Sequence, residues 1–134
     1  MTLRAAIAGV VLALCGLSAP SYATEWVNCS DAEGAATFSY LAGALDVLSV
    51  VGLNISVGDK VWASDVAYGP GEPVAVGQAF ETTDTVLIDA MDANLTARIA
   101  ELRLFKAAEG DAVVTAGTLR MPGHGAWAVS CSGP

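Results

Sequence analysis

The sequence predicts an all-β protein, a small antiparallel sandwich or barrel of about 7 to 9 strands that one disulfide bond ties end to end. Short apolar runs with period-two alternation recur along the chain, and Gly, Asp and Pro residues separate them at intervals of about 8 to 12 residues. Cys29 and Cys131 lie near the two ends of the part of the chain with this pattern. The alternative is an α+β fold with one helix near residues 94–105.

The first 23 residues have the three-part pattern of a secretory signal peptide. A positive Arg4 precedes an uncharged apolar run over residues 5–17, and Ser21 and Ala23 form a small-residue cleavage site. The run contains 13 residues, fewer than the about 20 that a transmembrane helix needs. We therefore expect the signal peptide to be removed, leaving residues 24–134 as a single β-rich domain without a transmembrane segment.

A lipid anchor on Cys15 is the alternative fate of this segment. Lipoprotein signals place a small residue directly before the modified cysteine, and here that position holds Leu14. Cleavage after Ala23 removes Cys15 and leaves two cysteines in the domain. The domain is thus expected to be periplasmic or secreted.

In the first half of the domain, strands are expected over residues 25–29, 37–41, 47–57 and 60–68. A run of Ser, Asp and Gly ends the first, and the third is rich in β-branched residues and ends at Gly58. In the fourth, two sets of side chains alternate along the strand. The sequence Gly69-Pro-Gly-Glu-Pro73 follows it and is the strongest turn signal in the chain.

In the second half, strands are expected over residues 74–80, 85–91, 94–109, 111–121 and 126–131. Residues 94–109 are ambiguous, because Leu95, Ile99 and Leu102 recur at helical spacing. The sequence Glu109-Gly-Asp111, however, is a hairpin turn that pairs this segment with the next one as strands. We expect mainly strand here.

Cys29 and Cys131 are expected to form a disulfide bond, as a cysteine pair does in an oxidising compartment. A zinc site would need two further ligands, and His124 is the only histidine. A redox site would place the thiols close together, as in Cys-x-x-Cys. The bridge closes a loop of about 100 residues, which restricts the unfolded chain and places the first strand beside the last.

The charge of the domain limits its partners. All fourteen Asp and Glu residues lie after residue 23. Together with the five Lys and Arg residues in the same part of the chain, they give the domain a net charge of −9. Binding to nucleic acid or to an anionic membrane relies on clustered Lys and Arg, so neither is an expected partner. A cationic protein is compatible with this balance.

Residues 62–73 are the segment most suited to contact a partner, because aromatic rings and carboxylates stand there on a rigid loop. One of the two rings is expected in the core and the other partly exposed. His124 joins the set as an exposed residue in a corner rich in Gly and Pro. The expected contact residues are Trp62, Asp65, Tyr68, Glu72 and His124.

The sequence predicts a protein that is not an enzyme and holds no metal or cofactor. A catalytic triad around His124 would need a nucleophile in a strained turn such as Gly-x-Ser-x-Gly, which is absent. The run Asp84, Asp89, Asp92 and Asn94 lacks the residue order of a calcium loop, and hairpin turn chemistry explains it more simply.

Asn-x-Ser/Thr sequences occur at Asn28, Asn54 and Asn94. We interpret them as coincidental, because the Ala, Val and Gly bias of the chain is typical of bacterial proteins, in which such sites are usually unmodified.

In size, expected export, acidity and disulfide use, the chain resembles the bacterial periplasmic lysozyme inhibitors. The resemblance is one of organisation, since their Ser-Gly-x-x-Tyr loop has no counterpart here, so no residue is carried over. It implies a binding module that inhibits a cationic protein such as lysozyme. A structural, envelope-associated domain acting through a strand edge or loop is one alternative, and a small barrel that carries an apolar ligand is another.

Overall fold

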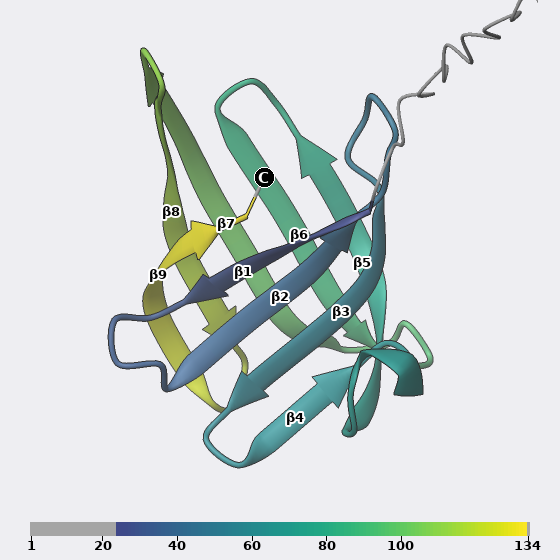
Figure 1. Cartoon of the computed structure of the whole chain (residues 1–134). Coiled ribbons are helices and arrows are strands. Elements are labelled where there is room, and N and C mark those ends of the chain that lie inside the picture. The colour runs from purple at the N-terminus through teal and green to yellow at the C-terminus, as the bar shows by residue number, and fades with distance from the viewer. Residues whose placement is uncertain (1–23, 134) are drawn as a thin grey trace, which may run out of the picture.

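In a computed structural model that describes residues 24–133, nine strands form one closed barrel (Figure 1). The elements are β1 (Glu25–Ser30), β2 (Ala36–Ala42), β3 (Val50–Val57), β4 (Lys60–Ala63), the 3₁₀ helix η1 (Val66–Tyr68), β5 (Glu72–Glu81), β6 (Thr85–Asp92), β7 (Arg98–Glu109), β8 (Ala112–Met121) and β9 (Gly125–Ser132). The predicted all-β class is confirmed. The expected signal peptide, Cys15 included, lies outside the described residues.

Alternation of side chains decides which face of each strand turns inward. In β2, Phe38 and Tyr40 are buried, whereas Thr37 and Ser39 between them remain partly exposed. The same alternation in the other strands fills the barrel from within, as in other small barrels. The largest side chains of this core are Phe38, Leu53, Ile55, Ile88, Leu102, Leu104, Leu119 and Met121.

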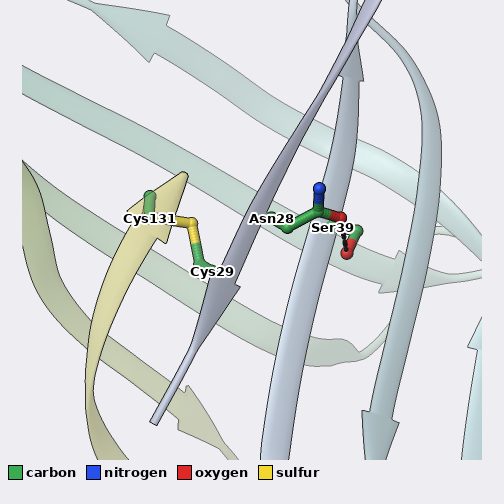
Figure 2. Close-up of a disulfide and its surroundings, with 4 residues drawn as sticks. All are labelled: Asn28, Cys29, Ser39 and Cys131. Carbon is green, nitrogen blue, oxygen red and sulfur yellow. Dashed lines mark hydrogen bonds between the residues drawn. A yellow bond between two sulfur atoms is a disulfide. The ribbon is translucent and has the colours of Figure 1, made fainter. Parts of the chain in front are cut away.

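The first and last strands lie side by side, as the sequence predicts, and their pairing closes the barrel. β1 pairs with β9 through three residue pairs, and the central pair is Cys29 opposite Cys131. These two cysteines form the expected disulfide bond (Figure 2). Asn28 points to the other side of β1, where its side-chain oxygen accepts a hydrogen bond from the Ser39 hydroxyl at 2.8 Å. The bridge therefore lies on the inner face and the polar pair on the outer face.

The expected strand over residues 60–68 is wrong in its second half. β4 ends at Ala63, and the Asp65 carboxylate accepts a hydrogen bond from the Ala67 amide at 2.8 Å, which caps η1. The chain then turns through Gly69 and Gly71 and returns beside β4 as β5. This return makes β4 and β5 the parallel neighbours of an otherwise antiparallel barrel.

Residues 94–109 form mainly strand, as expected, and the helix of the alternative fold does not occur there. The turn before β7 is built on Asp92, whose carboxylate accepts hydrogen bonds from the Thr96 and Ala97 amides at 2.6 and 3.1 Å. Leu95 lies in this turn with a positive φ of 59°. The turn chemistry predicted for Asp92 is confirmed, and the apolar residues that suggested a helix belong in part to this turn.

Candidate functional site

The segment between β4 and β5 forms two open hollows on the barrel surface. One has a volume of about 670 Å³ and is lined by residues that include Asp65, Val66 and Pro73. The other has a volume of about 480 Å³ and is lined by residues that include Asp59 and Glu72. Pro70 and Gly71 line both hollows and form the ridge between them. We call residues 59–73 together with His124 the η1 loop site.

The ridge is held tightly against β4. Gly71 has a φ of 146°, and a Cβ atom at this position would lie 2.4 Å from the carbonyl oxygen of Val61. Only glycine fits both the positive φ and the close approach. The ridge therefore has a fixed position with respect to the barrel wall.

Tyr68 anchors the other end of the loop on the outer face of the barrel. Its ring packs on the backbone of Gly52, where a Cβ atom would come within 2.8 Å of the ring. The ring also meets that of Trp26 edge to face, with the ring centroids 5.5 Å apart. The Asn54 side-chain amide donates a hydrogen bond to the Tyr68 carbonyl oxygen at 2.6 Å. These contacts hold η1 in one place on β3.

Trp62 and His124 come from distant parts of the sequence and meet beside the ridge. Their rings lie edge to face with centroids 5.3 Å apart. Trp62 is only 4% exposed and belongs to the core, whereas His124 is exposed. The indole therefore supports the imidazole from within, and His124 is the member of this pair that can reach a partner.

The rim of the η1 loop site carries more acid than base. Asp59, Asp65 and Glu72 are exposed, and Lys60 is the only Lys or Arg in the segment. Val66 directly follows Asp65, lines one of the two hollows with it and is 94% exposed. An exposed apolar side chain beside a carboxylate suits contact with a surface that carries both apolar and cationic groups.

Most cations elsewhere on the domain are already paired. Of the five Lys and Arg side chains in residues 24–133, four form ion pairs with carboxylates. Three arginines lie on the outer wall of β7 and β8 and surround two acids, of which Asp89 is 3% exposed. Hydrogen bonds from Arg98 and Arg120 hold the pKa of Glu101 below its ordinary value. The carboxylates left without such partners, those of the η1 loop site among them, dominate the field around the domain.

A second polar cluster lies at the opposite mouth of the barrel. Lys106 and Glu81 form an ion pair at 3.3 Å beside Tyr40. Burial, together with the charge of Glu81, raises the pKa of Tyr40 to about 12. The hollow there has a volume of about 60 Å³, too small for most ligands.

Of the five residues that the sequence singles out, Asp65 lines one hollow and Glu72 the other, Trp62 lies beneath the surface against the ring of His124, and Tyr68 is half-buried against the wall. The predicted segment 62–73 includes Val66 and Pro70, although neither was named as a contact residue, and Asp59 lies outside it and was missed. The strong turn signal at Gly69-Pro-Gly marked the place, but nothing local in the sequence shows that this turn folds back beside residue 59.

Within residues 24–133, no group of three or more His, Cys, Asp or Glu side chains is arranged to hold a metal ion. In the same residues, no helix has the length and apolarity to cross a membrane.

Comparisons with family models, curated proteins and solved structures give no match for this chain.

Proposed function

We propose that the domain is a binding module whose η1 loop site holds a cationic segment of another protein. The observation that carries this proposal is the pair of hollows on either side of the Pro70–Gly71 ridge, with carboxylates on their rims. The ridge and η1 are fixed by close packing and capping, so little ordering is needed on binding. A loop held in one conformation in this way is typical of inhibitors.

A cationic enzyme such as lysozyme is the specific target that we propose, and its inhibition is the activity. The barrel interior favours a surface role over the carriage of an apolar ligand, because large side chains that are less than 2% exposed fill it. Known small-molecule sites need about 300 Å³ or more. The two hollows of the η1 loop site, about 670 and 480 Å³, are above that size and lie on the surface.

We propose further that the domain works in the periplasm or outside the cell after loss of residues 1–23. A disulfide bond fits an oxidising compartment outside the cytosol. Mass spectrometry of protein isolated from its native compartment tests this directly, since the expected chain begins at Thr24. A chain that still carries residues 1–23, or free thiols on the native protein, would contradict it.

The binding test compares two double variants with the same change in net charge. Asp65→Asn with Glu72→Gln neutralises the rim while keeping side-chain shape, and Asn retains the ability to cap η1. Asp46→Asn with Glu109→Gln is the control and lies at the other end of the barrel. Affinity for c-, g- and i-type lysozymes is measured by calorimetry, and inhibition by a lysis turbidity assay.

We expect the rim variant to bind about 3- to 10-fold more weakly than the wild type and the control to bind normally, because exposed charges at an interface contribute modestly. Equal losses in both variants would mean that net charge alone attracts the partner, and the site would be wrong. If no lysozyme binds, lysozyme is not the target. The same variants then serve as baits in native periplasm or medium, where the partner must be cationic and lost only from the rim variant.

A further inference from the structure

The two hollows of the η1 loop site carry the same net charge. Asp65 is the charged residue that lines the first hollow. Its Oδ1 atom accepts a hydrogen bond from the Ala67 amide at 2.8 Å, which fixes the carboxylate and leaves Oδ2 as the atom that a cation can meet. Asp59, Glu72 and Lys60 line the second hollow, and two carboxylates with one ammonium group leave one negative charge there as well. Each hollow is therefore matched in charge to a single cationic group.

The walls of the hollows suit the stem of a basic side chain. Val66, Pro70 and Pro73 give the first hollow apolar walls, and Val61 and Trp62 do the same for the second. Lys and Arg side chains bury their methylene stems along apolar surface while their charged ends stay at polar groups. Each hollow thus offers an apolar wall for the stem and a carboxylate for the charged end of one Lys or Arg side chain.

The ridge between the hollows is one chain wide, and it stands beside the end of β4 (Figure 1). Neighbouring chains in a sheet pack about 4.8 Å apart, so two side chains that reach down on either side of a single chain must lie farther apart than this. In an extended segment, residues i and i+2 point to the same face at a separation of about 6.6 Å. Adjacent residues point to opposite faces, and residues i and i+4 are about 13 Å apart.

We propose that the partner segment at the η1 loop site is extended and places two basic side chains, at its positions i and i+2, one in each hollow. The Pro70–Gly71 ridge then lies between the two side chains. This inference rests on the proposed function and names the sequence pattern that the same site recognises.

The main chain of β4 favours an extended segment over a helix. β4 first meets β5 at the pair Trp62–Glu72, and Lys60 and Val61, which precede that pair, line the second hollow. An extended segment that lies in this hollow can add main-chain hydrogen bonds to β4. A helix cannot, because its own main-chain groups already bond to one another.

Three peptides of one composition test the spacing. Each has blocked ends and two lysines, set one, two or four positions apart in a background of Gly and Ala. Binding is followed at low ionic strength by the shifts of main-chain amide NMR signals, which should be largest in residues 59–73. We expect a dissociation constant of about 1 mM at a spacing of two. The other two peptides should bind about 3- to 10-fold more weakly, because each loses one of the two contacts.

Single variants show which hollow holds which lysine. Asp65→Asn and Glu72→Gln should each weaken binding of the spacing-two peptide about 3-fold. Asp46→Asn makes the same charge change at the other end of the barrel and should leave binding unchanged. Replacing one lysine of the peptide with glutamine should remove the effect of Asp65→Asn alone, and replacing the other should remove the effect of Glu72→Gln alone. Circular dichroism checks that each variant is folded.

Equal binding of the three peptides would overturn the inference, and so would binding of none of them below about 10 mM. Tightest binding at a spacing of four would also overturn it, since that spacing fits one face of a helix. A third contradiction would be two variants whose effects depend on the same lysine.

The proposed function fails or stands separately, because it is tested with whole proteins. If the peptides fail while a whole partner protein is lost only from the rim variant, the site binds a folded surface and the proposed function stands. If the peptides behave as expected while whole proteins bind the rim variant and its control equally, the pattern of recognition stands and the proposed function is wrong.

Discussion

Removing the disulfide bond with Cys29→Ala and Cys131→Ala should lower the free energy of unfolding by about 4 to 6 kcal/mol. The two cysteines are 102 residues apart, and closing a loop of this length restricts the unfolded chain by about 4.7 kcal/mol in the chain-entropy model. Cys29 is fully buried, so its truncation adds a packing loss of about 1 kcal/mol. Domains of this size are stable by about 5 to 15 kcal/mol, so the variant should be only marginally folded.

The bridge lies in one of the weaker seams of the barrel. β1 and β9 share three residue pairs, whereas β1 and β2 share six. Without the bridge, this seam should open before the ladders of β6, β7 and β8, which are longer. Hydrogen exchange at the amides of β9 should therefore accelerate more than exchange in β7.

Urea unfolding followed by far-UV circular dichroism measures the loss. With a slope of about 2 kcal/mol per molar urea, the unfolding midpoint should fall by about 2 to 3 M. Wild-type protein with and without reductant is the control and should show most of the same shift. A shift below about 0.5 M would mean that the bridge does not restrict the unfolded chain, and unchanged exchange in β9 would mean that the seam is stable without it.

Three further substitutions test the packing. Gly71→Ala should lower the free energy of unfolding by about 2 to 3 kcal/mol in urea, because its Cβ would meet the Val61 carbonyl oxygen. Gly123 also has a positive φ, but nothing lies within 4 Å of a Cβ there, so Gly123→Ala should lose less stability. Equal losses in the two variants would contradict the close approach of Gly71 to β4. Burial of Tyr40 raises its pKa from 10.0 to about 12, so stability that is fully present below pH 10 should fall by about 2 to 3 kcal/mol as pH rises to 12. Tyr40→Phe should remove that fall, and an unchanged pH profile would refute the cause. Asp89→Asn should lower the free energy of unfolding by about 1 to 2 kcal/mol, because two arginines lose their buried partner. An unchanged free energy of unfolding would show that water fully replaces the lost carboxylate.

Local periodicity was enough to predict most of the barrel. The period-two pattern in β2 and the turn signals between strands report directly on the backbone, because inward side chains must be apolar and turns need Gly, Pro or Asp. The disulfide between Cys29 and Cys131 then supplied the one long-range constraint that the sequence offers. It placed the first strand beside the last, an arrangement that both a sandwich and a barrel allow, and the structure shows the barrel.

The end of β4 could not be predicted from the same pattern. Alternation continues past Ala63, and Asp65 fits it as well as a strand residue would. The strand ends because side chains here form hydrogen bonds with the main chain in place of the β-ladder. The Asp65 carboxylate accepts from the Ala67 amide, and the Ser64 hydroxyl accepts from the Leu53 amide. Periodicity does not report such hydrogen bonds.

The site was predicted as a segment but not as a surface. That His124 meets Trp62 depends on where β4 and the turn between β8 and β9, 62 positions apart in the sequence, meet at one end of the barrel. The role of Asp89 was missed for the same reason. It looked like a turn or metal residue, and only the register of β6 against β7 places it between Arg98 and Arg103.

The charge of the domain gives the proposed contact at the η1 loop site a direct test. The arginines on the wall are neutralised by Asp89 and Glu101, so the acidic field comes from the loops and tips at the ends of the barrel. A cationic partner at the η1 loop site is drawn by that field, and its binding must weaken as salt screens it. A salt series therefore tests the assignment of the η1 loop site, and binding that strengthens as salt is added would show that its acidic rim does not attract the partner.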